Sequence, residues 1–272
     1  MILGDLPPLR EVLAAAGIGA DKRFGQHFLF DLNICRKIVR LAGPLEKTAV
    51  IEVGPGPGGL TRALLEAGAR VVAVEKDGRF MPILAQLAEA SDGRLTVMHA
   101  DAMRVDESAL PGAPTAVVAN LPYNVGSPLL VKWLTGPFRP AAMTLMFQKE
   151  VAQRVVAAPG GGDYGRLAVL AQALCEARVV MDLPAGAFTP PPKVASAVVR
   201  LTPRAPRPPD DLIASLQRIA KAAFGQRRKM LRACLRDLDG EALCAQAGID
   251  PSARAETVPV AGFLALARAA MD

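Results

Sequence analysis

Five short apolar runs, rich in β-branched residues, recur along the first half of the chain. Runs of this kind, bounded by glycine, proline or polar residues, predict buried strands of a parallel sheet. The five predicted strands are residues 49–54, 70–75, 95–100, 115–120 and 143–147.

Apolar residues three and four positions apart predict helices between these strands. The predicted helices are residues 59–68, 79–90, 128–136 and 149–158. Alternating strands and helices predict an α/β fold, with a doubly wound, Rossmann-like sheet covered on both faces. Residues 177–184 and 194–201 are also strand-like, and only a proline-rich loop separates them. We expect them to form an antiparallel hairpin at the sheet edge.

Residues 202–211 contain four prolines, which predict a boundary between a domain of residues 1–203 and a small all-α domain of residues 204–272. The first helix of the small domain is predicted to bury residues at helical spacing, namely Leu212, Leu216, Ile219 and Ala223. A second helix is predicted to start after Gly225, burying Leu231, Leu235 and Leu238 and carrying Arg228, Arg232 and Arg236 on its other face.

Composition excludes several classes of protein. With 272 residues, 51% of them hydrophobic, the chain can bury a core without covalent staples. Its four cysteines have no C-x-x-C spacing and it has only two histidines, so we expect neither a disulfide framework nor a metal site. The first residues lack the features of a secretory signal, and prolines and asparagines interrupt the uncharged stretch 108–131. We therefore expect a cytoplasmic protein without a membrane segment.

Charge narrows the choice of partner. The formal net charge is +6, and residues 218–236 contain seven basic and no acidic side chains. Such a run is commonly a solvated helix face. The lack of acidic neighbours favours contact with a polyanion.

Three glycines, Gly54, Gly56 and Gly59, lie between a predicted strand and a predicted helix. This G-x-G-x-x-G spacing lets a backbone approach a ligand closely, and Glu75 follows at the distance at which an acid binds ribose hydroxyls. Asp101, one strand further, is placed to accept a hydrogen bond from an adenine amine. The pattern predicts an adenosine site, in a dehydrogenase as readily as in a methyltransferase.

The stretch "NLPYN" at the end of the fourth predicted strand bears on that choice. A dehydrogenase needs a group that handles a proton, and this stretch offers none. It suits an exocyclic amine: the Asn120 side chain and the Leu121 carbonyl can accept its hydrogens, Pro122 fixes the turn, and Tyr123 stacks on the base. As single residues, Asn120 and Tyr123 also fit a strand-end turn and a half-buried core aromatic.

The chain resembles the ribosomal RNA adenine dimethyltransferase family over nearly its whole length. The matching stretches are "KRFGQHFL" (22–29), "IEVGPGPGGLT" (51–61), "VVAVEKD" (71–77), "HADA" (99–102), "NLPYN" (120–124), "YGRLAVLAQ" (164–172), "FTPPPKVASAVVRL" (188–201) and "AFGQRRKMLR" (223–232). The resemblance implies S-adenosyl-L-methionine as methyl donor and N6,N6-dimethylation of adjacent adenosines near the 3′ end of small-subunit ribosomal RNA. It also implies a partner, an assembling small subunit, and we expect the enzyme to be a monomer.

The resemblance assigns roles to individual positions. The N-terminal arm, residues 1–30, contributes to a cofactor site formed by Gln26, His27, Leu29, Gly54, Gly56, Glu75, Asp101, Ala102 and Asn120. The acceptor site is formed by Asn120, Leu121, Pro122, Tyr123 and Phe188, with Phe188 on the second face of the target base. The residues expected to bind RNA are Arg227, Arg228, Lys229 and Arg232. One departure is His27, where the family more often has asparagine.

Three alternatives remain. One is the antibiotic-resistance branch, which modifies large-subunit RNA and is disfavoured by the stretches "FGQRRKML" and "FTPPPKV". Another is an RNA-binding assembly factor without catalysis, which the complete set of Glu75, Asp101 and Asn120 disfavours. The third is the NAD-dependent dehydrogenase.

Overall fold

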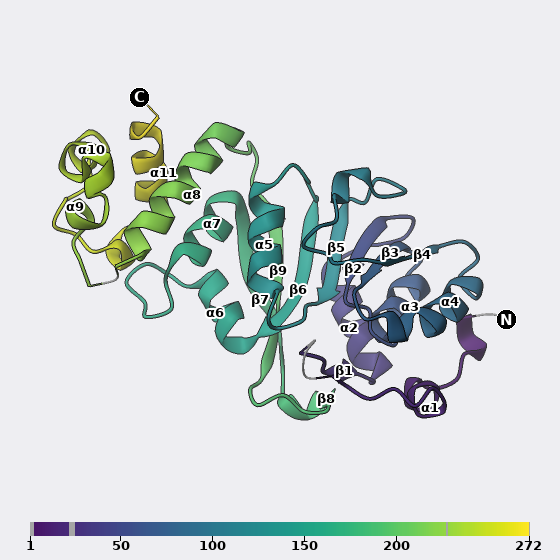
Figure 1. The fold of residues 1–272 in the computed structure, drawn as a ribbon. Helices are drawn as coiled ribbons and strands as arrows, with labels where there is room; N and C mark the ends of the chain where they lie inside the picture. Colours follow the sequence, from purple (N-terminus) through teal and green to yellow (C-terminus); the bar gives the residue numbers. More distant parts are fainter. Residues whose placement is uncertain (1–2, 22–24, 227, 272) are drawn as a thin grey trace. The chain divides into compact units, whose positions relative to one another are not determined.

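The computed structural model describes residues 3–21, 25–226 and 228–271 (Figure 1). Its strands are β1 (Phe28–Leu29), β2 (Ala49–Val53), β3 (Arg70–Glu75), β4 (Leu95–His99), β5 (Ala116–Asn120), β6 (Ala142–Gln148), β7 (Cys175–Leu183), β8 (Phe188–Thr189) and β9 (Ser196–Pro203). Its α-helices are α1 (Leu9–Ala15), α2 (Leu32–Ala42), α3 (Gly59–Glu66), α4 (Met81–Glu89), α5 (Gly126–Thr135), α6 (Lys149–Val156), α7 (Arg166–Leu174), α8 (Asp210–Phe224), α9 (Leu231–Cys234), α10 (Gly240–Gln246) and α11 (Val260–Ala269).

Seven strands form one sheet in the order β4-β3-β2-β5-β6-β9-β7 (Figure 1). The five strands predicted as parallel are parallel, from β4 through to β6. Strand β9 runs antiparallel to β6, and β7 pairs with β9 at the edge. The predicted α/β sheet with an antiparallel edge is therefore confirmed.

Apolar runs form the central strands because both faces of the sheet are covered. Val50 and Ile51 are neighbours in β2 and point to opposite faces, yet each is fully buried. Val50 belongs to a core cluster that also contains Ile38 of α2 and Leu64 of α3. This packing holds the carboxyl ends of β2, β3 and β5 at one edge of the sheet, where a ligand site is expected.

A second, two-stranded sheet was not predicted. Strand β1 pairs antiparallel with β8, with Phe28 opposite Thr189 and Leu29 opposite Phe188. The pairing joins the N-terminal arm to the loop between β7 and β9, which was expected to be irregular. It brings residues 26–29 to the carboxyl edge of the large sheet.

The chain divides into two compact units. Unit 1 contains residues 1–133, 137–152 and 178–201, and unit 2 contains residues 134–136, 153–177 and 202–272. Unit 2 therefore includes α7 in addition to the C-terminal helices, whereas the domain boundary at residues 203 and 204 stays a prediction. Within unit 2, α8 buries the four residues that were predicted to face its core.

The second helix predicted in the C-terminal region is mostly absent. Residues 226 and 228–230 form turns and an isolated bridge, and α9 spans only Leu231–Cys234. Leu231 and Leu235 are buried as predicted, while Leu238 is half-buried.

In the part of the chain that the structure describes, every helix is too short or too polar to cross a bilayer. No group of three or more His, Cys, Asp and Glu side chains among those residues is arranged to hold a metal ion. The four cysteines are free thiols.

Candidate active site

A cavity of about 200 Å³ opens at the carboxyl ends of the parallel strands in unit 1. All but one of the residues predicted to bind cofactor or acceptor line it. Those that do are Gln26, His27, Leu29, Gly54, Gly56, Glu75, Asp101, Ala102, Asn120, Leu121, Pro122 and Tyr123. Residues from five separate stretches of sequence thus meet at the edge of the sheet where α/β folds bind ligands.

The glycine loop brings its neighbours into contact at two positions. Gly54 has a φ of +70°, and a Cβ atom there would lie 3.3 Å from Cδ of Pro122. A Cβ atom on Gly59, at the start of α3, would lie 2.7 Å from the carbonyl oxygen of Leu29. Side chains at either position would push the acceptor turn or the N-terminal arm away from the loop.

Glu75 ends β3 with both carboxylate oxygens held by the backbone. Oε2 accepts a hydrogen bond from the Gly56 N–H at 3.0 Å, and Oε1 accepts one from the Asp77 N–H at 2.8 Å. Burial raises the pKa of Glu75, and the two backbone hydrogen bonds counteract part of that rise. Because each oxygen has a second lone pair, the carboxylate can still accept hydrogen bonds from two neighbouring hydroxyls.

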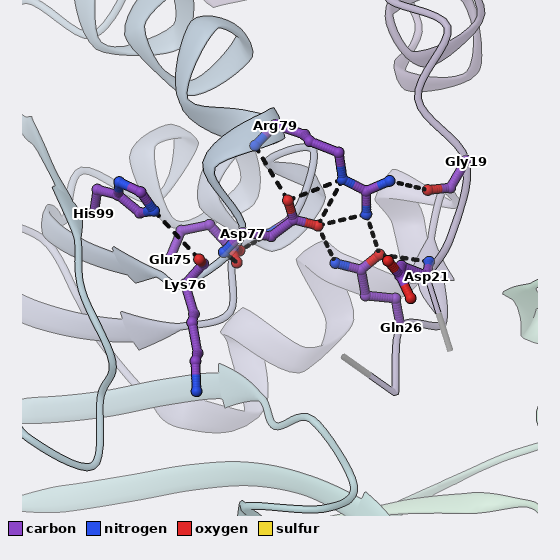
Figure 2. Close-up of polar contacts among 9 residues, drawn as sticks. Gly19, Asp21, Gln26, Glu75, Lys76, Asp77, Arg79 and His99 are labelled. Carbon is purple, nitrogen blue, oxygen red and sulfur yellow. Dashed lines mark hydrogen bonds and ion pairs between the residues drawn. The ribbon is translucent and has the colours of Figure 1, made fainter. Parts of the chain in front are cut away.

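A polar network beside Glu75 ties the N-terminal arm to the turn after β3 (Figure 2). The Asp77 carboxylate accepts from Arg79 Nη2 at 2.6 Å and from Gln26 Nε2 at 2.8 Å. Gln26 Oε1 in turn accepts from the Asp21 N–H at 2.9 Å. The hydrogen bonds from Arg79 and then Gln26 lower the pKa of Asp77 to about 2, against the effect of its burial. Gln26 therefore fixes the arm in place as well as lining the cavity.

Asp101 follows β4, the strand next to β3, and also lines the cavity. Its Oδ2 forms an ion pair with Lys76 Nζ at 2.9 Å, and its Oδ1 accepts from the Met103 N–H at 3.0 Å. The hydrogen bond from Lys76 is the main cause of a lowered pKa, so Asp101 is a charged acceptor at neutral pH. Lys132 holds the adjoining loop through the Ala102 carbonyl oxygen at 2.9 Å.

Asn120 ends β5 and lies half-buried at the cavity wall. Its Nδ2 donates to the His27 carbonyl oxygen at 3.5 Å, and no described residue donates to its Oδ1. The chain then turns, because the N–H groups of Val125 and Gly126 both donate to the Pro122 carbonyl oxygen at 3.1 Å. Asn120 Oδ1 is thus available to accept a hydrogen bond from a bound molecule.

The Tyr123 ring lies between two groups that fix it. Its hydroxyl is 2.8 Å from Ser196 Oγ, and its ring centroid is 5.2 Å from that of His27, at an interplanar angle of 30°. His27 Nδ1 is 2.8 Å from the Pro190 carbonyl oxygen. The imidazole therefore packs against the acceptor aromatic, and the His27 main chain meets Asn120.

Phe188 is the predicted acceptor residue that the structure does not bring to the cavity. It is 3% exposed, pairs with Leu29 across the two-stranded sheet and belongs to the core cluster. A contact between Phe188 and a target base stays a prediction, and this arrangement does not favour it.

The predicted RNA-binding residues belong to unit 2. Arg228, Lys229 and Arg232 are exposed, and Arg227 lies outside the described residues. Their exposure fits contact with a polyanion, while their role stays a prediction.

Four residues near the cavity were not assigned a role from the sequence: Glu52, Asp77, Arg79 and Ser196. In the sequence, the signal for Glu52 is a single carboxyl residue within an otherwise apolar predicted strand. Asp77 lies in the stretch "VVAVEKD" that matches the family, but only Glu75, two positions before it, was assigned a role. Arg79 pairs with Asp77, two positions before it, but its contacts with the N-terminal arm, like the bond of Ser196 to Tyr123, join residues distant in sequence, which no local pattern indicates.

Taken together, these groups can hold a nucleoside and align a second reactant. Acidic side chains end β3 and follow β4, where they can bind ribose hydroxyls and a base amine. Across the cavity, Asn120 presents an acceptor beside an aromatic ring. Neither the Asn120 amide nor the Tyr123 hydroxyl transfers protons readily near neutral pH, so the acceptor side of the cavity is suited to catalysis by alignment.

Comparison with known proteins agrees with this geometry. Residues 19–272 match the family model described as ribosomal RNA adenine dimethylase. The chain is 65% identical to ribosomal RNA small subunit methyltransferase A of Phenylobacterium zucineum over 270 residues, covering 99% of this chain and 94% of the relative. It is 66% identical to the protein of the same name from Caulobacter vibrioides over 252 residues, covering 93% and 98% of the two chains.

Two solved structures share the fold and part of the sequence. A dimethyladenosine transferase from Plasmodium falciparum superposes with a TM-score of 0.73 at 25% identity, covering 88% of this chain and 96% of the other. The 23S rRNA methyltransferase ErmE superposes with a TM-score of 0.66 at 27% identity, covering 90% of this chain and all of the other.

Proposed function

Because the chain belongs to the ribosomal RNA adenine dimethylase family, it is a ribosomal RNA adenine dimethyltransferase, and we propose that it modifies adjacent adenosines near the 3′ end of small-subunit RNA. The relatives named for the small subunit, at 65% and 66% identity, favour that subunit over the large one. The observation that carries the chemistry is the Oδ1 of Asn120, which accepts no hydrogen bond from any described residue, at a cavity that Glu75 and Asp101 also line.

The cavity fits S-adenosyl-L-methionine as methyl donor. Glu75 has lone pairs left for two ribose hydroxyls, and Asp101 is a charged acceptor for an adenine amine. Gly54 and Gly56 let the backbone approach the donor closely, and Gln26, His27, Leu29 and Ala102 complete the wall. When bound, the donor supplies an activated methyl group on a sulfonium.

In the acceptor site, Asn120 Oδ1 and the Leu121 carbonyl oxygen accept the two hydrogens of the adenine N6 amine. This draws the nitrogen lone pair out of conjugation with the ring and directs it along the line of transfer. Tyr123 stacks on the base and Pro122 fixes the turn. The methyl group would pass from the sulfonium of the donor to N6, the sulfur keeping the electrons of the broken bond, and the methylated amine would then lose its proton to solvent.

The basic segment of unit 2 contacts the phosphates of the RNA substrate. We assign this role to Arg228, Lys229 and Arg232, all exposed. The substrate is an assembling small subunit in the cytoplasm, and the enzyme acts as a monomer.

Replacing Asn120 by alanine tests the proposal. We expect turnover to fall at least ~100-fold while the dissociation constant for S-adenosylmethionine changes little, because the amide acts mainly in the transition state. Methyl incorporation and calorimetry measure the two effects. Asn33→Ala, an asparagine of α2 that contacts Arg36, serves as the matched control.

Unchanged turnover in Asn120→Ala would eliminate the acceptor role. A wild-type protein stabilised by NAD and not by S-adenosylmethionine would instead refute the cofactor assignment. A protein that binds the donor and the small subunit without methylating it would be an assembly factor.

A further inference from the structure

A buried hydroxyl anchors the proposed acceptor aromatic. Ser196 is the first residue of β9, is fully buried, and is paired with Gln148 of β6. Its Oγ is 2.8 Å from the Tyr123 hydroxyl, and no other described residue forms a hydrogen bond with the Ser196 hydroxyl. A serine in this interior position costs free energy unless its hydroxyl is paired, so the bond to Tyr123 is what satisfies it.

The bond fixes Tyr123 at the end of its ring. The centroid of the His27 ring lies 5.2 Å from that of Tyr123, so the aromatic is held at its hydroxyl and by contact with the imidazole. Ser196 also belongs to a strand that is hydrogen-bonded into the sheet. The hydroxyl end of Tyr123 is therefore anchored to the sheet as well as to the turn that carries the residue, and the contact with His27 restricts rotation of the ring.

The two methyl transfers depend differently on the position of the Tyr123 ring. An unmodified amine has two hydrogens, which Asn120 Oδ1 and the Leu121 carbonyl oxygen can both hold. A monomethylated amine has one hydrogen, so one of these contacts is lost. Stacking against Tyr123 must then supply a larger share of the alignment, which makes the second transfer more sensitive to movement of the ring.

We propose that Ser196 is a positioning residue that acts through Tyr123 to support the second methyl transfer. The inference rests on the proposed function of the cavity. Ser196 does not contact the reacting atoms, and its effect is on the completion of dimethylation.

The test compares Ser196→Ala, Tyr123→Phe and the double variant. Each is incubated with small ribosomal subunits from cells that lack this protein, and nucleoside mass spectrometry follows the mono- and dimethylated adenosine. We expect the rate of the second transfer to fall about fivefold in each single variant, the effect of one lost hydrogen bond, and monomethyladenosine to accumulate. The double variant is expected to be no slower than either single variant, because all three lack the same bond.

Ser215→Ala is the matched control, since Ser215 is also buried and donates to the Ala267 carbonyl oxygen at 2.8 Å. It removes a buried hydroxyl within unit 2 and is expected to leave the product ratio unchanged. Binding of S-adenosylmethionine to each variant shows that its cavity is intact.

The inference is overturned if donor-binding Ser196→Ala keeps the wild-type product ratio, or if the effects of the two single variants add in the double variant. It is also overturned if the first and second transfers slow equally. A wild-type protein that methylates no adenosine would be a different result, because it would refute the proposed function itself.

Discussion

Glu52 is a carboxyl group buried in the middle of β2 next to the proposed cofactor cavity. It is 1% exposed, and its Oε2 has no hydrogen-bond partner among the described residues. Burial, reinforced by the negative charge of Glu75, raises the pKa of Glu52 from 4.5 to about 8. The group is therefore protonated in the folded protein at neutral pH.

This pKa predicts how stability depends on pH. Between about pH 4.5 and 8 the unfolded chain releases a proton that folded Glu52 keeps, so rising pH favours unfolding by up to ~1.4 kcal/mol per unit. Glu52→Gln removes this term, and its free energy of unfolding should increasingly exceed that of the wild type as pH rises towards 8. Urea denaturation at several pH values measures the difference.

Glu46→Gln, which removes an exposed carboxyl group, should keep the wild-type pH dependence. Parallel stability profiles for the wild type and Glu52→Gln would contradict the raised pKa.

Residues at strand ends were predictable because the carboxyl ends of parallel strands meet at one edge. Glu75, Asp101 and Asn120 line one cavity for that reason. Phe188 was placed at the acceptor site by resemblance alone, and its burial depends on pairing with Leu29, which no local pattern reveals.

At the scale of elements, the segment between α8 and α9 differs most from expectation. Helical spacing of Arg228, Arg232 and Arg236 predicted one helix, but residues 228–230 form a turn and a bridge between Met230 and Arg254. Tertiary pairing overrides the helical pattern here, and it also forms the short β1–β8 pair where no strand was predicted. Such pairings join residues far apart in sequence, beyond the reach of periodicity.

Arg228 and Lys229 lie in that segment with their side chains exposed. Replacing both by alanine should weaken RNA binding and reduce the slope of log affinity against log salt by about 1 to 2, since each phosphate contact releases counterions. Affinity for S-adenosylmethionine should stay unchanged. Binding titrations at several salt concentrations measure both effects.

Lys37→Ala with Arg40→Ala removes the same charge from exposed positions of α2 and is the control. An equal loss of RNA affinity in both double variants would mean that net charge, and not this segment, governs binding.

At the scale of the whole molecule, the sheet was predictable because its central apolar runs are buried on both faces and because helices α3, α4 and α5 connect three of the successive pairs of parallel strands. The division into two units was harder to predict from the sequence, because α7 joins the C-terminal helices although it precedes β7 and β9 in sequence. Prolines mark a break in the chain, but they do not show which earlier elements share a core with the residues that follow.

The most direct test is methyl transfer to purified ribosomal subunits that lack the modification. The protein is incubated with S-adenosylmethionine carrying a labelled methyl group, and with small or large subunits separately. We predict that label enters small-subunit RNA as N6,N6-dimethyladenosine and that large subunits remain unlabelled. Label in large-subunit RNA alone, or none in either subunit with a protein that binds the donor, would contradict the account.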